Sequence, residues 1–229
     1  MKMISWYLWK PKDKSFARKF VFSPYLSPRS LRYHPKPKGD LLIRLLTFGF
    51  LPIFSVLLAR HFMNPLNHFE IMLFSPAIYF LIETLGAIGQ LIFYKTPTFS
   101  IHRSPLFATS LSYFWGRDWN LWVQDWLRDI TQSIGRGKHS RRIIVVFFIS
   151  GVFHEVMCNL PYWIFYDESY FGTMMAYFFI QAVALWIDKK IVHHWPILWR
   201  RLYLWLVVIV PSPLFINVPL LTFLGLTHD

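Results

Sequence analysis

Charged residues are scarce in this sequence. They make up 16% of its 229 residues, against about a quarter in a typical soluble domain. Hydrophobic residues make up 55% and aromatic residues 20%, and the aromatic residues Trp and Tyr favour the interface between membrane and water. The composition argues against a soluble domain and predicts an integral membrane protein.

Cysteine is almost absent, since Cys158 is the single one. An intramolecular disulfide is therefore excluded. Cys158 stands inside an apolar run, which favours a small core residue over a thiol nucleophile. We expect no metal site, because no group of His, Cys or carboxyl residues has the spacing of a metal motif. The first forty residues also lack an uninterrupted apolar run, which argues against a cleavable signal peptide.

Five apolar runs, each near the length of about 20 residues that spans a hydrocarbon core, follow a basic segment of residues 1–40. The chain is thus expected to be an all-α polytopic membrane protein, with a cytoplasmic or interfacial segment 1–40 and a membrane domain 41–229. Prolines at 211, 213 and 219 predict that the last run is kinked, broken or shorter than it looks. The expected spans lie near 41–59, 71–94, 143–166, 171–187 and 202–224.

Basic residues alternate between the connections of these runs. Residues 1–40, 95–142 and 188–201 are rich in Lys and Arg, whereas the connections near 60–70 and 167–170 are poor in them. The positive-inside rule then places the N-terminus in the cytoplasm. The net charge of +12 is explained by this bias and by contacts with anionic headgroups. We therefore expect membrane lipids as partners and no nucleic acid.

An amphipathic helix that lies in the membrane interface is predicted near residues 112–134. Apolar side chains recur there at helical spacing, and charged side chains fall on the other side. Asn120 falls at the edge of the polar face, where it could either turn toward a cavity or be solvated. The apolar face is formed by Trp115, Trp119, Trp122, Val123, Trp126, Leu127 and Ile130.

Two ionisable residues, His154 and Glu155, stand at the midpoint of the run 143–166. Charge within a span is costly, so such groups usually face a bundle interior or a wet cavity. Adjacent helical residues lie about 100° apart, so the two side chains need not pair. Ser150 and Gly151 would let another helix or a substrate approach closely. A neutral imidazole here is suited to act as a general base, although a purely structural histidine also fits.

Two stretches carry a family resemblance: "YFWGRDWN" at 113–120 and "FFISGVFHE" at 147–155. Together they resemble the membrane-bound O-acyltransferase superfamily, and most of all its wax synthase branch, over about residues 27 to 224. The resemblance implies that His154 and Asn120 are the catalytic residues. It further implies that His154 activates an acceptor hydroxyl, which attacks an acyl-CoA thioester, and that Asn120 orients the substrate or stabilises developing charge.

The implied substrates are acyl-CoA and a lipidic alcohol, with acyl-CoA as cosubstrate and no bound cofactor. Family members usually carry more spans before the basic loop, so the resemblance implies an N-terminally short chain. The missing helices could be absent, could be supplied by a second chain or an oligomer, or could belong to a longer protein of which this chain is a fragment. Basic residues before the catalytic run could contact the phosphates of coenzyme A. The expected substrate-binding residues are Trp115, Arg117, Trp119, Ser150, Glu155, Arg136, Lys138, Arg141 and Arg142.

The resemblance leaves the acceptor open. Wax ester synthesis on a long-chain fatty alcohol is the leading prediction. The alternatives are an acyltransferase for a sterol or diacylglycerol hydroxyl, and a non-catalytic membrane paralogue or subunit. A multi-pass protein of the endoplasmic reticulum is expected in a eukaryote, and one of the inner membrane in a bacterium.

Overall fold

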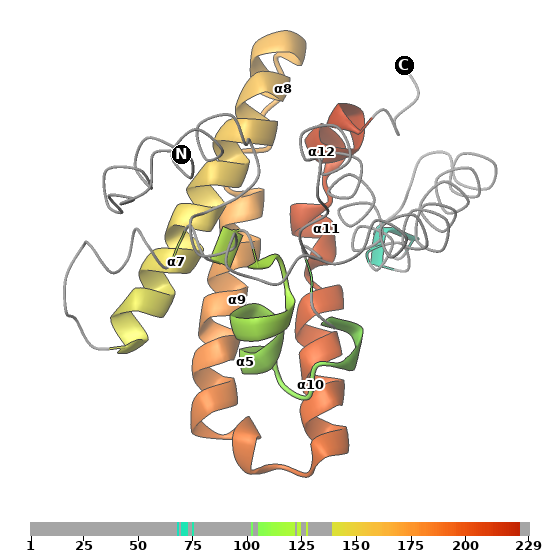
Figure 1. The fold of residues 1–229 in the computed structure, drawn as a ribbon. Helices are drawn as coiled ribbons and strands as arrows, with labels where there is room; N and C mark the ends of the chain where they lie inside the picture. The colour runs from blue at the N-terminus through green and yellow to red at the C-terminus, as the bar shows by residue number, and fades with distance from the viewer. Residues whose placement is uncertain are drawn as a thin grey trace, which may run out of the picture. The chain divides into compact units, whose positions relative to one another are not determined.

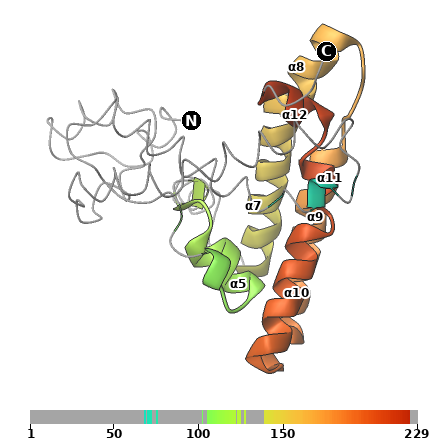
Figure 2. The same cartoon turned by 90° about the vertical axis from the view of Figure 1, so that its right-hand side faces the viewer.

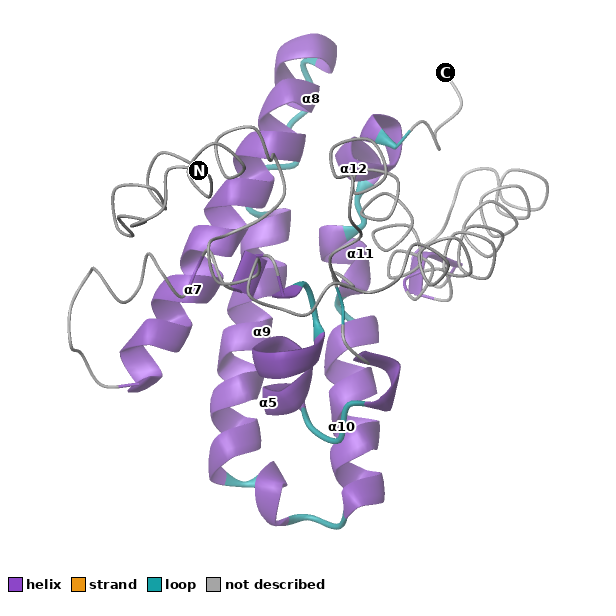
Figure 3. Cartoon of the chain, in the orientation of Figure 1, coloured by secondary structure: helices purple, strands orange, loops and turns teal. Residues whose placement is uncertain are grey.

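The computed structural model describes residues 68, 70–72, 75, 102, 105–121, 123, 124, 127 and 139–224 (Figure 1), without the side chains of residues 139–142. Within this part of the chain the regular elements are all helical and no strand occurs (Figure 3), which agrees with the expected all-α class. The segment 1–40, the span expected near 41–59 and most of the one near 71–94 lie outside it.

The described residues belong to two compact units. The first contains residues 102, 105–107, 113–121, 123, 124 and 127. The second contains residues 68, 70–72, 75, 108–112 and 139–224.

The longest helical segment of the second unit has three parts. It consists of α7 (His139–His154), a π-helical turn η4 (Glu155–Asn159) and α8 (Leu160–Tyr166). The π-turn begins directly after His154, and such turns occur often at functional sites. Residues 143–166 are apolar enough to cross a membrane, and 24 helical residues extend for about 36 Å, more than a hydrocarbon core of about 30 Å.

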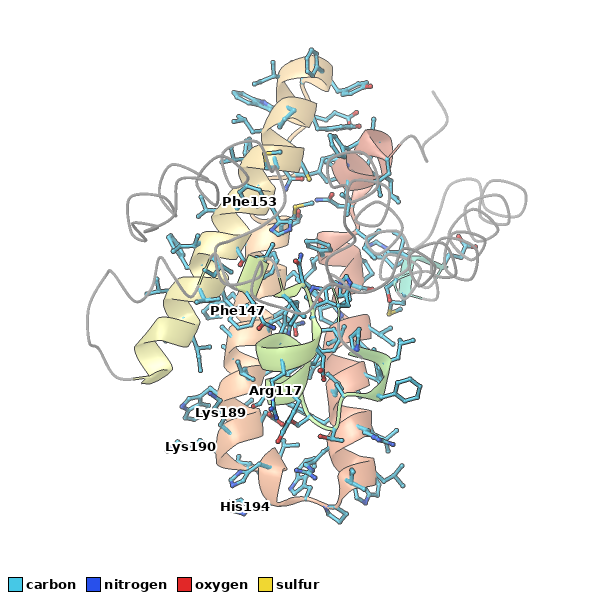
Figure 4. All side chains as sticks on the ribbon, in the orientation of Figure 1. Arg117, Phe147, Phe153, Lys189, Lys190 and His194 are labelled. Carbon is cyan, nitrogen blue, oxygen red and sulfur yellow. The ribbon has the colours of Figure 1, made fainter. Side chains whose placement is uncertain are left out.

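A helical hairpin follows this segment. Helix α9 (Thr173–Lys190) leads through the short 3-10 turn η5 (Val192–His194) into α10 (Ile197–Ile209). Figures 1 and 2 show α9 running antiparallel to α7 and α10, and it contacts both. Lys189, Lys190 and His194 lie at the end where α9 meets α10 (Figure 4). The acidic connection near residue 167 lies at the opposite end.

The last apolar run is broken, as its prolines predict. Helix α10 ends at Ile209, and two short helices follow, α11 (Ser212–Phe215) and α12 (Val218–Phe223). Proline lacks the backbone N–H that a continuing helix needs. The stretch long and apolar enough to cross a membrane is Ile197–Phe215 rather than the predicted 202–224. Together with residues 143–166, it makes two candidate spans in the described part of the chain.

Large apolar side chains cover the outside of these helices. Such exposure is unfavourable in water and favourable against lipid tails. It supports assignment of the second unit to a membrane. The exposed residues include Ile144, Phe148, Val152, Phe165, Leu198, Trp199, Leu202 and Leu206.

The predicted interfacial helix near 112–134 is not continuous. A 3-10 turn, η2 (Pro105–Phe107), precedes α5 (Leu111–Tyr113) and a π-helical turn η3 (Phe114–Asp118). The helix stops there, because Trp119 is extended and Asn120 has a positive φ of 40°. The π-turn also changes the helical period. As a result Asp118, expected on the charged face, is buried.

Candidate active site

The imidazole of His154 is held in one orientation by its own helix. Its Nδ1 lies 2.7 Å from the carbonyl oxygen of Ser150, one turn earlier. A carbonyl oxygen can only accept, so Nδ1 carries the proton in this contact. In the neutral ring, Nε2 then keeps its lone pair and can accept a proton. This is the tautomer that a general base needs.

Aromatic rings surround the same imidazole. Its ring centroid lies 4.9 Å from that of Phe178 on α9 and 5.0 Å from that of Phe215 on α11. Phe153 adds a third ring at 5.5 Å, with its plane perpendicular to the imidazole. The side chain is nonetheless only half-buried. Helices α7, α9 and α11 therefore place aromatic rings around a histidine that keeps some access from outside.

Glu155 points in a different direction and binds the start of α9. Its Oε1 accepts hydrogen bonds from the backbone N–H groups of Gly172 (3.0 Å) and Met175 (2.9 Å). Its Oε2 accepts one from the side-chain amide of Asn159 at 2.6 Å. The carboxyl group thus caps the N-terminus of a neighbouring helix, where backbone N–H groups have no partner within their own helix. Both oxygens thus hold the start of α9 and Asn159 in place, and the contact of Glu155 with substrate stays a prediction.

A buried polar network extends from Glu155 to the last helix. The Nδ2 of Asn159 also donates to the Tyr170 carbonyl (3.0 Å), and its Oδ1 accepts a hydrogen bond from Asn217 (3.0 Å). Asn217 donates to the Thr173 hydroxyl oxygen (2.8 Å) and caps α12 by accepting from the Leu220 N–H. These side chains connect η4, α9 and α12 directly beside the catalytic candidate.

Gly151 permits close contact between α7 and α9, as its position predicted. A Cβ atom on Gly151 would lie 2.5 Å from the sulfur of Met175 and 3.3 Å from its Cα. An added Cβ would therefore force the Met175 side chain to move and would crowd its backbone. The preceding Ser150 is buried and supplies the carbonyl that orients His154. The predicted contact of Ser150 with a substrate stays a prediction.

Asn120 belongs to the first unit, where it starts a new helical segment. Its Oδ1 accepts a hydrogen bond from the Val123 N–H (3.1 Å), and its carbonyl accepts one from the Gln124 N–H (3.0 Å). This is an N-cap arrangement. Gln124 in turn donates to the carbonyl oxygens of Trp115 (2.7 Å) and Trp119 (3.0 Å), which the end of the preceding helix leaves open. The side-chain Nδ2 of Asn120 remains as a donor.

The predicted binding residues Trp115 and Trp119 lie in an aromatic cluster of the first unit. Trp119 stacks on Phe114 at 5.2 Å and meets His102 edge-on at 4.4 Å. Trp115 and Trp119 approach to 6.2 Å. Arg117 is exposed and lies 5.0 Å above the Tyr113 ring, in a cation–π contact. These contacts shape the backbone that presents Asn120.

The structure brings together residues that sequence reasoning missed. The contact of Asn159 with Glu155 could have been predicted from the sequence, because residues four positions apart face one another on a helix. Packing between helices alone brings four further residues to the site: Phe178, Phe215, Thr173 and Asn217.

Among the predicted basic residues, Arg141 and Arg142 lie in the first turn of α7. Arg136 and Lys138 lie outside the described residues.

Comparison with known proteins supports the resemblance. Residues 99–181 match the membrane bound O-acyl transferase family. The match contains both Asn120 and His154. No solved structure matches the chain significantly.

A relative from Arabidopsis thaliana, named "Probable long-chain-alcohol O-fatty-acyltransferase 6", is 28% identical over 181 residues. The alignment covers 70% of this chain and 49% of the relative, so the chain spans about half the length of the curated protein it matches. The name of this relative agrees with the predicted wax synthase-like branch. The two motif stretches, the family match and the relative all make this chain similar to the membrane bound O-acyl transferase family.

Proposed function

We propose that the chain is an O-acyltransferase that esterifies a long-chain fatty alcohol with the acyl group of acyl-CoA, with His154 as general base. The observation that carries the proposal is the hydrogen bond from Nδ1 of His154 to the Ser150 carbonyl, at the centre of an apolar span. The family match and the name of the Arabidopsis relative support the class of reaction.

One histidine suffices for both proton transfers of the reaction. Nε2 removes the proton of the alcohol hydroxyl as the oxygen attacks the thioester carbonyl carbon. The resulting tetrahedral intermediate collapses, the carbon–sulfur bond breaks, and the proton passes from the imidazolium to the leaving thiolate. The products are an ester and coenzyme A. The aromatic rings of Phe178 and Phe215 lie against the imidazole, and these apolar surroundings favour a lipidic alcohol over water as the acceptor.

Asn120 supplies a hydrogen-bond donor in this scheme. Its Oδ1 is engaged in the helix cap, and its Nδ2 is available to donate to the thioester carbonyl oxygen. That oxygen gains negative charge as the tetrahedral intermediate forms, so a fixed donor lowers the barrier. The cap sets the orientation of the amide before any substrate arrives.

Coenzyme A brings several phosphate charges to the start of α7. Arg141 and Arg142 lie in the first turn of this helix, and Arg136 and Lys138 precede it in the sequence. A helix N-terminus favours an anion through its free N–H groups. We assign the coenzyme A phosphates to this cluster. The acyl chain and the alcohol, both lipids, reach His154 from within the membrane.

The first experiment measures ester formation in membranes that contain the full chain, supplied with labelled palmitoyl-CoA and hexadecanol. We expect labelled wax ester from the wild type and none from His154→Ala. His193→Ala, which changes an exposed histidine in η5, is the matched control and should keep the activity. Parallel reactions contain a sterol or diacylglycerol instead of hexadecanol. Ester from either of these alone would reassign the acceptor, and equal ester from His154→Ala would refute the role of His154.

A further inference from the structure

Asp188 is a buried carboxyl group that the reaction scheme does not use. It lies near the C-terminal end of α9 and is 1% exposed. Burial of a carboxyl group is unfavourable unless it has good hydrogen-bond partners. Its location makes the burial more costly, because the C-terminal end of a helix carries a partial negative charge. Helix α9 by itself would be more stable with an apolar residue here.

Among the described residues, the hydrogen-bond partner of this carboxyl group is Ser112. Oδ2 of Asp188 accepts hydrogen bonds from the Ser112 backbone N–H (3.0 Å) and from its hydroxyl (2.6 Å). The other oxygen, Oδ1, is buried and has no hydrogen-bond partner in the part of the chain that the structure describes. The hydrogen bonds of Asp188 therefore tie the segment 108–112 to α9 within the second unit.

The segment held in this way is well packed and leads into the motif. Ala108, Ser110 and Leu111 are all at most 4% exposed. Ser112 is followed directly by Tyr113, the first residue of "YFWGRDWN", which ends at Asn120. The Ser112 N–H also belongs to the first turn of the helix that starts at Leu111, where N–H groups lack partners within the helix.

Helix α9 is thus bound by a buried carboxyl group at each end. Glu155, next to His154, caps its start, and Asp188 near its end holds the residue before the motif. Helix α9 therefore contacts the residue that follows His154 and the residue that precedes the motif 113–120.

We propose that Asp188 is a positioning residue for acyl transfer, because it anchors segment 108–112 and so fixes where the motif begins. The reaction part of this inference rests on the proposed function. The anchoring part does not, and it is tested first without an activity measurement.

Anchoring is tested by the reactivity of a cysteine. In a Cys158→Ala background, Ser110→Cys places a single thiol on the anchored segment, where the wild-type side chain is buried. A membrane-permeant maleimide should label this thiol slowly. Asp188→Leu should speed the labelling by about tenfold or more, because exposure of a buried group follows the population of open states. Unchanged labelling would refute the anchor.

Two variants control for general loosening of the helix. Gln181→Leu removes another fully buried side chain of α9, one that donates to the Val207 carbonyl on α10. It should leave the labelling of the thiol unchanged. Ser112→Ala removes only the hydroxyl hydrogen bond and should give an intermediate rate. If Gln181→Leu speeds labelling as much as Asp188→Leu, the anchor is not specific.

The positioning role is tested by kcat, calculated per folded molecule, in variants that keep Cys158. Asp188→Leu should lower kcat by about 10- to 100-fold, since small displacements of reacting groups have effects of this size, while KM for acyl-CoA should change little. Asp188→Asn keeps one acceptor oxygen, which suffices because both bonds end on Oδ2, so its kcat should stay within about tenfold of wild type. Adding Ser112→Ala to Asp188→Leu should have no further effect.

The outcomes separate the two proposals. A kcat for Asp188→Leu within twofold of wild type, or additive effects of the two substitutions, would refute the positioning role. No ester from the wild type with any acceptor would refute both the proposed function and that role, while the labelling result would still decide the anchor.

Discussion

Two neighbouring residues, His154 and Glu155, have separate tasks. The imidazole is surrounded by aromatic rings and directs one nitrogen to its own helix. The carboxyl group turns away and caps α9. This division follows from the angle of about 100° between adjacent helical residues, which prevents both from facing one cavity. A pair of ionisable residues in a span can therefore contain one chemical group and one structural group.

Glu155→Gln tests the structural part of this division. An amide nitrogen cannot accept a hydrogen bond, so the substitution leaves at least one donor at the start of α9 or on Asn159 unpaired. We expect the protein to lose about 1–3 kcal/mol of stability and to lose turnover as well. Thermal unfolding in detergent would measure the first effect. Glu168→Gln makes the same change at an exposed site and should have almost no effect; equal melting temperatures for both variants would contradict the cap.

Asn120 caps a helical segment and is proposed to donate a hydrogen bond to the substrate, and substitution can separate the two roles. Asn120→Ala removes both the cap and the amide donor, so it should cost about 0.5–2 kcal/mol of stability and lower turnover by roughly 100-fold. Asn120→Asp keeps an oxygen that can cap the helix and tolerates the positive φ, but it loses the Nδ2 donor. This variant should therefore keep a melting temperature close to that of the wild type and have a lowered kcat. Melting temperature and kcat together distinguish the functions, and full turnover in Asn120→Asp would exclude the donor role.

At the scale of elements, the close approach of α7 to α9 at Met175 requires a residue without a side chain, which is Gly151. Gly151→Ala would place a methyl group against the backbone and sulfur of Met175. We expect a loss of about 1–3 kcal/mol, typical of overpacking, and a displaced His154. Gly116→Ala is the matched control, because no atom lies within 4 Å of its added Cβ. The melting temperature in detergent checks the prediction, and a Gly151→Ala protein as stable as Gly116→Ala would disprove the close approach.

Helical periodicity in the sequence gave a correct prediction for the apolar run 143–166 and a wrong one for the amphipathic stretch 112–134. The run 143–166 is helical throughout because every residue gains from burial or from lipid, so a local π-turn does not change its overall course. The stretch 112–134 was expected to form one helix from the spacing of its tryptophans. A π-turn and the cap at Asn120 divide it, and neither feature changes the apolar spacing that the pattern measures.

For the whole molecule, the distribution of basic charge predicts how acyl-CoA is bound. Neutralising Arg136, Lys138, Arg141 and Arg142 together should raise KM for acyl-CoA by roughly tenfold, because charged contacts to phosphate are lost, with a smaller change in kcat. The double variant Lys189→Gln, Lys190→Gln is the control, since these basic residues lie where α9 turns into α10 and not at the start of α7. An unchanged KM in the first variant would leave the cluster with a topological role alone. Steady-state kinetics over a range of acyl-CoA concentrations measures both variants.

The sequence by itself determined the membrane character, the helical class, the two motif stretches and the resemblance to a family. These depend on composition and on short-range order, which are present before the chain folds. It also singled out His154 and Asn120, because the motifs carry them directly.

Only the tertiary structure decided what the neighbouring residues do. The aromatic rings around His154 come from α9 and α11, the network of Asn159, Thr173 and Asn217 joins three elements, and Asp188 finds Ser112 across 76 residues of chain. These partners are far apart in sequence, and their contacts depend on which faces of the helices meet. Helical periodicity defines the faces of each helix, and packing between helices selects the faces that touch.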